Sequence, residues 1–445
     1  MNGSNGGCAA RRPKTRASAE ICNNRQDGKA IGHSNYIDTL DRETKMTIAR
    51  YSLIAAAVLA MTACGKQEPT KQASQPAAKS DASAPAKSAN IIKIGHAAPL
   101  TGNIAHLGKD NENGVRMAVD EINAAGGVEI AGKKLKIELI SEDDQADPKT
   151  ATTVAQRFVD QKVSGVIGHL NSGTTIPASK IYSDAGIPQI SPSATAVAYT
   201  AQGFKTTFRV MANDAQQGKV LGQFAVNKLK AKKVAIVDDR TAYGQGLADE
   251  FEKAAKAAGA EIVKREFTTN QETDFNSILT TIKGVKPELI FYGGMDAQAA
   301  PLTKQARKLG IKAPVMSADG AQTPEFIKLA GADAEGTYAS IPGLPKEQLP
   351  GGKEFLAKFK QKFNTEVQLY APNCYDAVMV MLEAMKKAGS TEPAKYLPAL
   401  SKVDYSGVTG KIAFDEKGDL KNGAITIYQV KKGKWEIVET VGGGK

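Results

Sequence analysis

The chain has 445 residues, with 58 lysines and arginines against 47 acidic residues, and a formal net charge of +11. About +3 of this lies in residues 1–45, +3 in residues 46–89 and +5 along the rest. This spread of charge favours solubility and gives no indication of a nucleic-acid-binding protein. Of four cysteines, only Cys374 follows residue 89, so the body of the chain can form no internal disulfide.

Residues 46–63 are predicted to be a secretion signal. Met46 and Arg50 precede an apolar run of 11 residues, 53–63. That run is too short for a bilayer span of roughly 20 residues and suits the apolar middle of a signal peptide. The small residues before Cys64 resemble a bacterial lipobox, in which the cysteine is acylated and becomes the mature N-terminus. An ordinary cleaved signal and a buried helix are the alternatives.

The segments on either side of this signal have no pattern of a folded domain. Residues 1–45 show no apolar periodicity of 2 or 3.6, which favours an untranslated or disordered extension over a basic nucleic-acid-binding arm. Residues 65–89 are rich in Ala, Ser, Lys and Pro and lack any apolar residue larger than Ala. This composition predicts a flexible tether, residues 64–89 with the lipidated cysteine, whose reach is roughly 25–30 Å. We therefore expect a periplasmic monomer held to a membrane by its lipid.

From residue 90 onward, strand-like and helix-like segments alternate. The first half has strands at 91–100, 133–144, 163–170 and 188–192 and helices at 113–127, 147–161 and 174–186. The second half has strands at 232–239, 261–267, 288–294 and 314–319 and helices at 246–260, 274–284 and 297–310. This alternation predicts parallel sheets covered by helices on both faces. Because a body of roughly 350 residues exceeds a usual single core, we expect an α/β fold of two doubly wound lobes.

Polar residues follow several of these strands. In doubly wound sheets, ligands bind beyond the carboxyl ends of the strands. The residues found there are Ser172, Ser193, Thr195, Tyr243 and Asp319. Hydroxyl groups and free N–H groups at a helix N-terminus suit a carboxylate, although serine and threonine also serve simply as helix caps. Two such loops occur in the first half of the body, and Tyr243 and Asp319 stand at equivalent points of the second half. Together they favour a ligand site over simple helix caps.

Four segments resemble the leucine/isoleucine/valine-binding proteins of bacterial ABC transporters. They are residues 167–195, 234–248, 289–298 and 414–423, and the resemblance covers nearly all of 91–440. It implies a type I periplasmic binding protein, a Venus-flytrap of two Rossmann-like lobes joined by a three-stranded hinge. One lobe would comprise 90–212 and 343–418, and the other 213–342 and 419–441.

The resemblance also implies that an amino-acid zwitterion binds between the lobes. Ser172 and Thr195, with the backbone of Ser193 and Ala194, would bind the α-carboxylate and part of the α-ammonium group. Tyr243 would reach over from the second lobe, and Asp319 would pair with the ammonium group. The closed form would then deliver the amino acid to a membrane permease.

The ligand side chain would lie in a pocket lined by Leu107, Leu170, Asn171, Met295 and Tyr370. Three features depart from the family pattern. The ammonium partner is often glutamate, and Asp319 is one methylene shorter. Two cysteines that are often bridged beside the site are here Ala146 and Asn171. The amide of Asn171 and the flexible Met295 weaken strict leucine selectivity, so alanine, threonine or another small amino acid stays possible.

Rival functions have less support in the sequence. The dinucleotide motif, the phosphate loop and the G-x-S-x-G nucleophile turn are missing, and His96, His106 and His169 lack metal-ligand spacing. We therefore expect neither an enzyme nor a cofactor or metal site, and expect His169 to be a packed or hydrogen-bonded residue. Residues 1–45 show no helix-turn-helix pattern of a transcription regulator. A sensor for amino acids or amides with the same fold is the alternative to transport.

Overall fold

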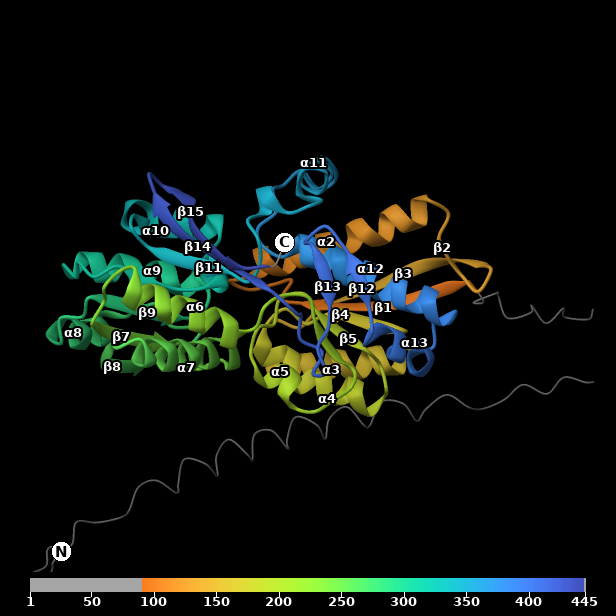
Figure 1. Ribbon diagram of the computed structural model, residues 1–445, viewed down its shortest axis with the longest axis horizontal. Coiled ribbons are helices and arrows are strands. Elements are labelled where there is room, and N and C mark those ends of the chain that lie inside the picture. The colour runs from red at the N-terminus through yellow and green to blue at the C-terminus, as the bar shows by residue number, and fades with distance from the viewer. Residues whose placement is uncertain (1–89, 444–445) are drawn as a thin grey trace, which may run out of the picture. The chain divides into compact units, whose positions relative to one another are not determined.

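A computed structural model describes residues 90–443 of the chain. This part is built from two sheets with helices on both faces, as Figure 1 shows. The predicted signal, Cys64 and the tether lie outside the described residues. None of the helices within 90–443 has the length and apolar character needed to cross a membrane.

The first sheet has six strands in the order β2-β3-β1-β4-β5-β6. All neighbours are parallel except β2 and β3. Side chains alternate between two cores, so that Val166 packs against α3 and α4 while Ile167 packs on the side of α2 and α12. The elements are β1 (Ile91–Ala98), α2 (Ala105–Ala124), β2 (Val128–Ile130), β3 (Lys133–Asp143), α3 (Pro148–Asp160), β4 (Gly165–Gly168), α4 (Ser172–Asp184), β5 (Gln189–Ser191), α5 (Ala198–Ala201) and β6 (Thr207–Arg209).

The second sheet has seven strands in the order β15-β14-β11-β10-β9-β7-β8. Val234 and Ile236 of β7 pack with α6 and α7, whereas Ala235 and Val237 pack with α8 and α9. The elements are α6 (Asp214–Asn227), β7 (Lys233–Asp238), α7 (Ala242–Ala257), β8 (Glu261–Phe267), α8 (Asn276–Gly284), β9 (Leu289–Gly293), α9 (Asp296–Lys308), β10 (Val315–Met316), η1 (Asp319–Ala321), α10 (Pro324–Ala330), η2 (Gly331–Ala334) and β11 (Tyr338–Ile341).

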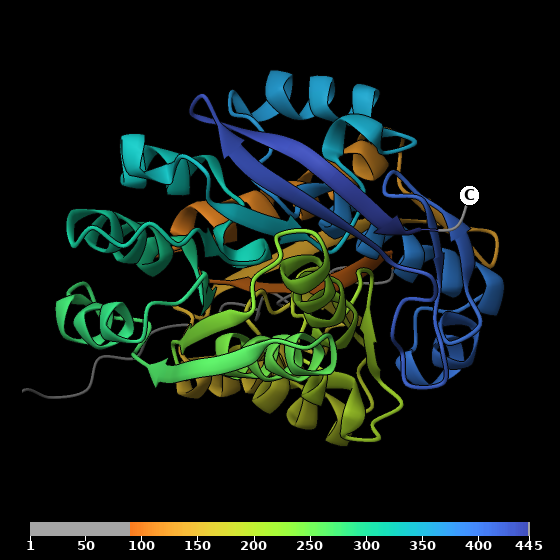
Figure 2. The same cartoon turned by 60° about the vertical axis from the view of Figure 1, so that its left-hand side comes forward.

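After β11 the chain returns to the first sheet and then leaves it again. Helix α12 packs against α2 so closely that a Cβ on Gly114 would lie 2.3 Å from the Ala371 carbonyl oxygen. The hairpin of β14 and β15 then completes the second sheet, as the dark blue strands in Figure 2 show. The elements are η3 (Lys346–Gln348), α11 (Gly352–Phe363), α12 (Ala371–Ala388), α13 (Pro393–Leu400), β12 (Asp404–Ser406), β13 (Lys411–Ala413), β14 (Ala424–Lys431) and β15 (Lys434–Gly442).

The two-lobed α/β fold is confirmed, but the details correct the sequence analysis in three places. The helix predicted at 113–127 begins at Ala105, and the one predicted at 246–260 begins at Ala242, where the Thr241 hydroxyl caps the N–H of Gly244. The sheets are also not purely parallel, because β2, β14 and β15 pair antiparallel with their neighbours. The exact lobe boundaries stay predictions.

Candidate functional site

Two loops at the carboxyl ends of β4 and β5 meet, as their sequences predict. The Ser172 hydroxyl, at the first residue of α4, accepts the N–H of Ala196 at 3.1 Å. The Ser193 hydroxyl donates to the carbonyl of Leu170 at 3.1 Å. Thr195 is buried, and its hydroxyl has no hydrogen-bond partner within residues 90–443. The structure therefore brings Ser172, Ser193 and Thr195 together and leaves the Thr195 hydroxyl available.

Asp319 lies at the carboxyl end of β10 and is 2% exposed. Its carboxylate accepts the Tyr243 hydroxyl at 3.0 Å, the Gln217 amide at 2.5 Å and the Tyr370 hydroxyl. Burial raises the pKa of Asp319, although these three donors act in the opposite direction. Tyr370 precedes α12, which packs on the first sheet, so its bond to Asp319 joins the two lobes.

Asp214 is a candidate site residue that the sequence analysis missed. It begins α6 and is fully buried, and neither carboxylate oxygen has a hydrogen-bond partner in the described part of the chain. Burial, and next the negative charge of Asp319, raise the pKa of Asp214 to about 8. The nearby Thr195 hydroxyl and Arg209 cation act against this shift. Gln217, one turn further along α6, also has a buried amide oxygen without a partner among residues 90–443.

Most of the predicted side-chain pocket lies in one apolar cluster. Leu107 of α2, Leu170 in the loop after β4 and Met295 in the loop after β9 belong to it, together with Tyr243 of α7. Close packing is visible at Gly320, where an added Cβ would approach the Met295 sulfur to 2.7 Å. Two predicted pocket residues lie outside this cluster. The ring of Tyr370 belongs to the core of the first sheet, and the Asn171 amide oxygen is buried without a partner in the described residues.

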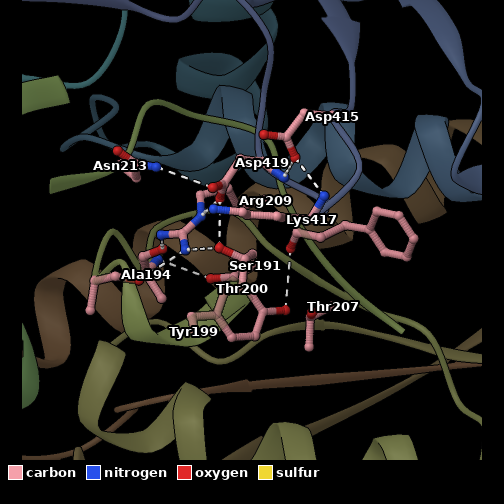
Figure 3. Close-up of polar contacts among 12 residues, drawn as sticks. Ser191, Ala194, Tyr199, Thr200, Thr207, Arg209, Asn213, Asp415, Lys417 and Asp419 are labelled. Atoms are coloured by element: carbon pink, nitrogen blue, oxygen red, sulfur yellow. Dashed lines mark hydrogen bonds and ion pairs between the residues drawn. The ribbon is translucent and has the colours of Figure 1, made fainter. Parts of the chain in front are cut away.

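Arg209, at the end of β6, is fully buried behind the Ser193–Ala196 loop (Figure 3). Its guanidinium donates to the carbonyls of Ala194 at 2.7 Å and Ala196 at 2.9 Å. Its Nε lies 2.6 Å from Asp419, which also accepts the Asn213 amide at 3.1 Å. These bonds fix the loop relative to the start of α6 and to the segment that leads into β14.

Asp110, on α2, holds the segment that carries Tyr370. Its buried carboxylate accepts four consecutive backbone N–H groups, those of residues 368–371, at 2.8–3.0 Å. Burial raises the pKa of Asp110, while these four bonds oppose the shift. A carboxylate that accepts this many backbone donors fixes the local chain path, and here it sets the position from which Tyr370 reaches Asp319.

The three histidines within residues 90–443, His96, His106 and His169, all form hydrogen bonds. His169 contacts Asp144 at 2.8 Å and Tyr182 at 2.9 Å, which confirms that it is a packed, hydrogen-bonded residue. Within residues 90–443, no three His, Cys, Asp or Glu side chains are arranged to hold a metal ion.

Comparison with known proteins shows the family of this chain. Residues 91–434 match the family described as periplasmic binding protein. The leucine-, isoleucine-, valine-, threonine-, and alanine-binding protein of Pseudomonas aeruginosa is 36% identical over 344 residues, 77% of this chain and 91% of that protein. The Leu/Ile/Val-binding protein homolog 1 of Brucella melitensis is also 36% identical, with the same coverage. Among solved structures, the branched-chain amino acid transporter substrate-binding protein LivJ of Streptococcus pneumoniae, in complex with isoleucine, is 33% identical with a TM-score of 0.73, over 80% of this chain and all of that one.

Proposed function

Because the chain belongs to the periplasmic binding protein family, we propose that it is the substrate-binding protein of an ABC importer. It captures an amino acid between its lobes, with leucine, isoleucine and valine as the first candidates, and delivers it to a membrane permease. The named relatives that bind branched-chain amino acids support this assignment. It acts as a binding protein and catalyses no reaction.

The observation that carries the proposal is a buried group of acceptors that lack donors. Asp214 and Gln217 present buried oxygens without a hydrogen-bond partner within residues 90–443, beside the Thr195 hydroxyl, which acts on Asp214. No cationic side chain in that range forms an ion pair with Asp214 or Asp319. A buried carboxylate without a partner costs several kcal/mol, which a cation can offset. An ammonium group supplies one positive charge and three N–H donors, so it matches this group of acceptors.

The opposite end of the ligand would lie against the first lobe. Ser172 and the N-terminus of α4 offer a hydroxyl and backbone N–H groups to the α-carboxylate. The Ala194 N–H already donates to the Ser191 hydroxyl at 2.9 Å, so in our proposal Ser193 and Ala194 mainly shape the loop. The ligand side chain would extend toward Leu107, Leu170 and Met295.

A ligand that contacts both lobes favours their closure by its differential affinity for the closed state. Ser172 and Thr195 would capture it on the first lobe, and Asp214, Asp319 and Tyr243 would engage on closing. A micromolar Kd corresponds to about −8 kcal/mol.

Calorimetric titration tests this function. The purified protein is unfolded and refolded to remove carried-over ligand, then titrated with each of the twenty amino acids. Micromolar binding of leucine, isoleucine or valine would support the proposal. Binding of small or polar amino acids alone would keep the ammonium site and assign the pocket's preference to Asn171. If no amino acid binds, the proposed function is wrong.

The predicted periplasmic location and lipid anchor can be tested separately. We propose that Cys64 carries the lipid, which labelled palmitate would detect in cells that express the protein. Cys64→Ala should abolish the label, whereas the matched variant Cys374→Ala should keep it, because Cys374 is buried within the fold. Label that persists in Cys64→Ala would contradict the anchor.

A further inference from the structure

One ion pair joins the lobes just outside the proposed ligand site. Nε2 of His106, on α2, lies 2.7 Å from Oδ2 of Asp296, the first residue of α9. Helix α2 packs on the first sheet and α9 packs on the second. The contact therefore exists only while the lobes are closed. Each partner is also the chain neighbour of a pocket residue, since Leu107 follows His106 and Met295 precedes Asp296.

The two partners differ in their access to solvent. The Asp296 side chain is fully buried, and its Oδ2 also accepts the Thr323 hydroxyl at 2.6 Å. Its other oxygen, Oδ1, has no partner in the described part of the chain. The His106 side chain keeps 24% of its surface exposed, so it can exchange protons with water. An imidazole in such a position is the side chain best suited to respond to pH between 5 and 8.

The other charges around His106 favour its protonated form. The groups that act on it are Asp296 on α9, Glu325 on α10 and Asp110 on its own helix, and all three are acidic. Lysines nearby are already paired, Lys328 with Glu325 at 3.1 Å and Lys109 with Glu112 at 2.5 Å.

We propose that His106 and Asp296 form a closure latch that holds the lobes together more strongly when His106 is protonated. This inference rests on the proposed function, because it assigns a pH dependence to the affinity of that same site. The latch adds no contact to the ligand. It stabilises the closed state that retains the ligand, and so lowers the Kd as the pH falls.

The direction follows from linkage. Burial alone lowers the pKa of His106, but the hydrogen bond and charge of Asp296 outweigh it and leave the pKa above its ordinary value of 6.5. In open lobes this partner is lost, so the pKa returns toward that value. The closed state thus binds the proton more tightly. The extra stability that protonated His106 gives the closed state over the open state is complete below pH 6.5. It disappears as the pH rises through the pKa of His106 in the closed state.

The test compares wild type with His106→Gln, which keeps an N–H donor for Asp296 but does not titrate. Calorimetry measures the Kd for the preferred amino acid at pH 6 and pH 8. Other groups of the site titrate equally in both proteins, so only the difference between the two pH dependences matters. We expect the ratio of Kd at pH 8 to Kd at pH 6 to be about three- to tenfold larger in wild type. Asp296→Asn should lose the same three- to tenfold excess in this ratio.

Equal pH dependence in wild type and His106→Gln would overturn the latch and leave the proposed function intact. If wild type binds no amino acid at either pH, the proposed function fails instead. The latch is then decided by small-angle scattering of the ligand-free protein. We expect wild type to be more compact at pH 6 than at pH 8 and His106→Gln to be the same at both. No such difference in wild type would also overturn it.

Discussion

Replacing Asp214 with asparagine should change ligand affinity and stability in opposite directions. Asparagine has nearly the same shape but neither charges nor titrates. In the proposed site, Asp214 is the carboxylate whose oxygens have no partner within residues 90–443, so the ligand ammonium is the cation that offsets its charge. In the ligand-free protein, the buried Asp214 must hold a proton, and this requirement costs stability as the pH rises, a cost that Asp214→Asn removes.

The expected changes in Kd and in the free energy of unfolding follow from the surroundings of Asp214. Removing one partner of a buried charge pair costs about 2–5 kcal/mol, so the Kd should rise at least about 30-fold. The pKa of Asp214 is about 8 in the folded protein and 3.8 as its ordinary value. The folded state therefore holds a proton that the unfolded chain releases, and stability falls as the pH rises between these values. At about 1.4 kcal/mol per pH unit, moving from pH 5 to pH 7 should cost wild type about 3 kcal/mol that Asp214→Asn does not lose.

Urea unfolding of both ligand-free proteins at pH 5 and pH 7 measures the stability term, and calorimetry at pH 7 measures the affinity term. Glu250→Gln is a matched control, because Glu250 also raises the pKa of Asp214 but lies on α7 and has the smallest of these effects on it. It should leave the affinity nearly unchanged. An equal pH dependence of stability in wild type and Asp214→Asn, or a Kd within threefold of wild type, would refute the role of Asp214.

Three further variants probe other parts of the structure. Asp319→Ala should abolish measurable amino-acid binding in calorimetry, because it removes the acceptor on which two tyrosines and Gln217 converge; near-normal affinity would contradict the site. Arg209→Ala should lower the free energy of unfolding in urea by about 3–5 kcal/mol, because it leaves Asp419 without its buried partner, and an unchanged midpoint would oppose this. Gly114→Ala should cost about 1–3 kcal/mol in thermal unfolding by forcing α12 away from α2, a prediction that an unaltered Tm would exclude.

Helices and strands could be predicted from the sequence where their apolar periodicity is strong. Their boundaries were mispredicted where polar residues are buried. The helix predicted at 113–127 leaves out residues 110–112, Asp-Asn-Glu, which belong to α2 and are at most 3% exposed. Their partners come from distant parts of the chain, such as residues 368–371 for Asp110 and Ser193 for Asn111. A short stretch of sequence shows the helical residues but not the distant groups that hydrogen-bond to their polar side chains. The start of α2 could therefore not be placed from apolar periodicity alone.

The sheet topology shows the same limit. Alternating strands and helices predict parallel pairing up to residue 319, and β7, β9 and β10 follow that pattern. The strands β14 and β15 instead pair antiparallel after the chain has passed through α11–α13 on the other lobe. Local sequence patterns can indicate a strand. They cannot show which sheet that strand joins when three helices on the other lobe precede it in the chain. Only the family resemblance placed residues 419–441 in the second lobe.

The candidate site also contains residues that the sequence could indicate and one that it could not. Ser172, Thr195, Tyr243 and Asp319 follow strands, where a rule about strand ends finds them. Asp214 follows Asn213, which forms a capping box with Gln216, and an acidic residue in the first turn of a helix is an ordinary helix-start signal. Its role appears only when α6 packs beside Asp319.

In the proposed site, two carboxylates would surround one ammonium group, and their surroundings give each a different part. Asp319 already accepts three donors, so its charge is spread over Tyr243, Tyr370 and Gln217, and it serves mainly to orient the site. Burial, and next the negative charge of Asp319, raise the pKa of Asp214 to about 8, so that at neutral pH Asp214 holds a proton while the site is empty. In the proposed site, an arriving ammonium group would replace that proton, and one positive charge would be exchanged for another. We infer that this exchange lets a buried site with two acids stay folded without its ligand and still pair fully with a cation when it closes.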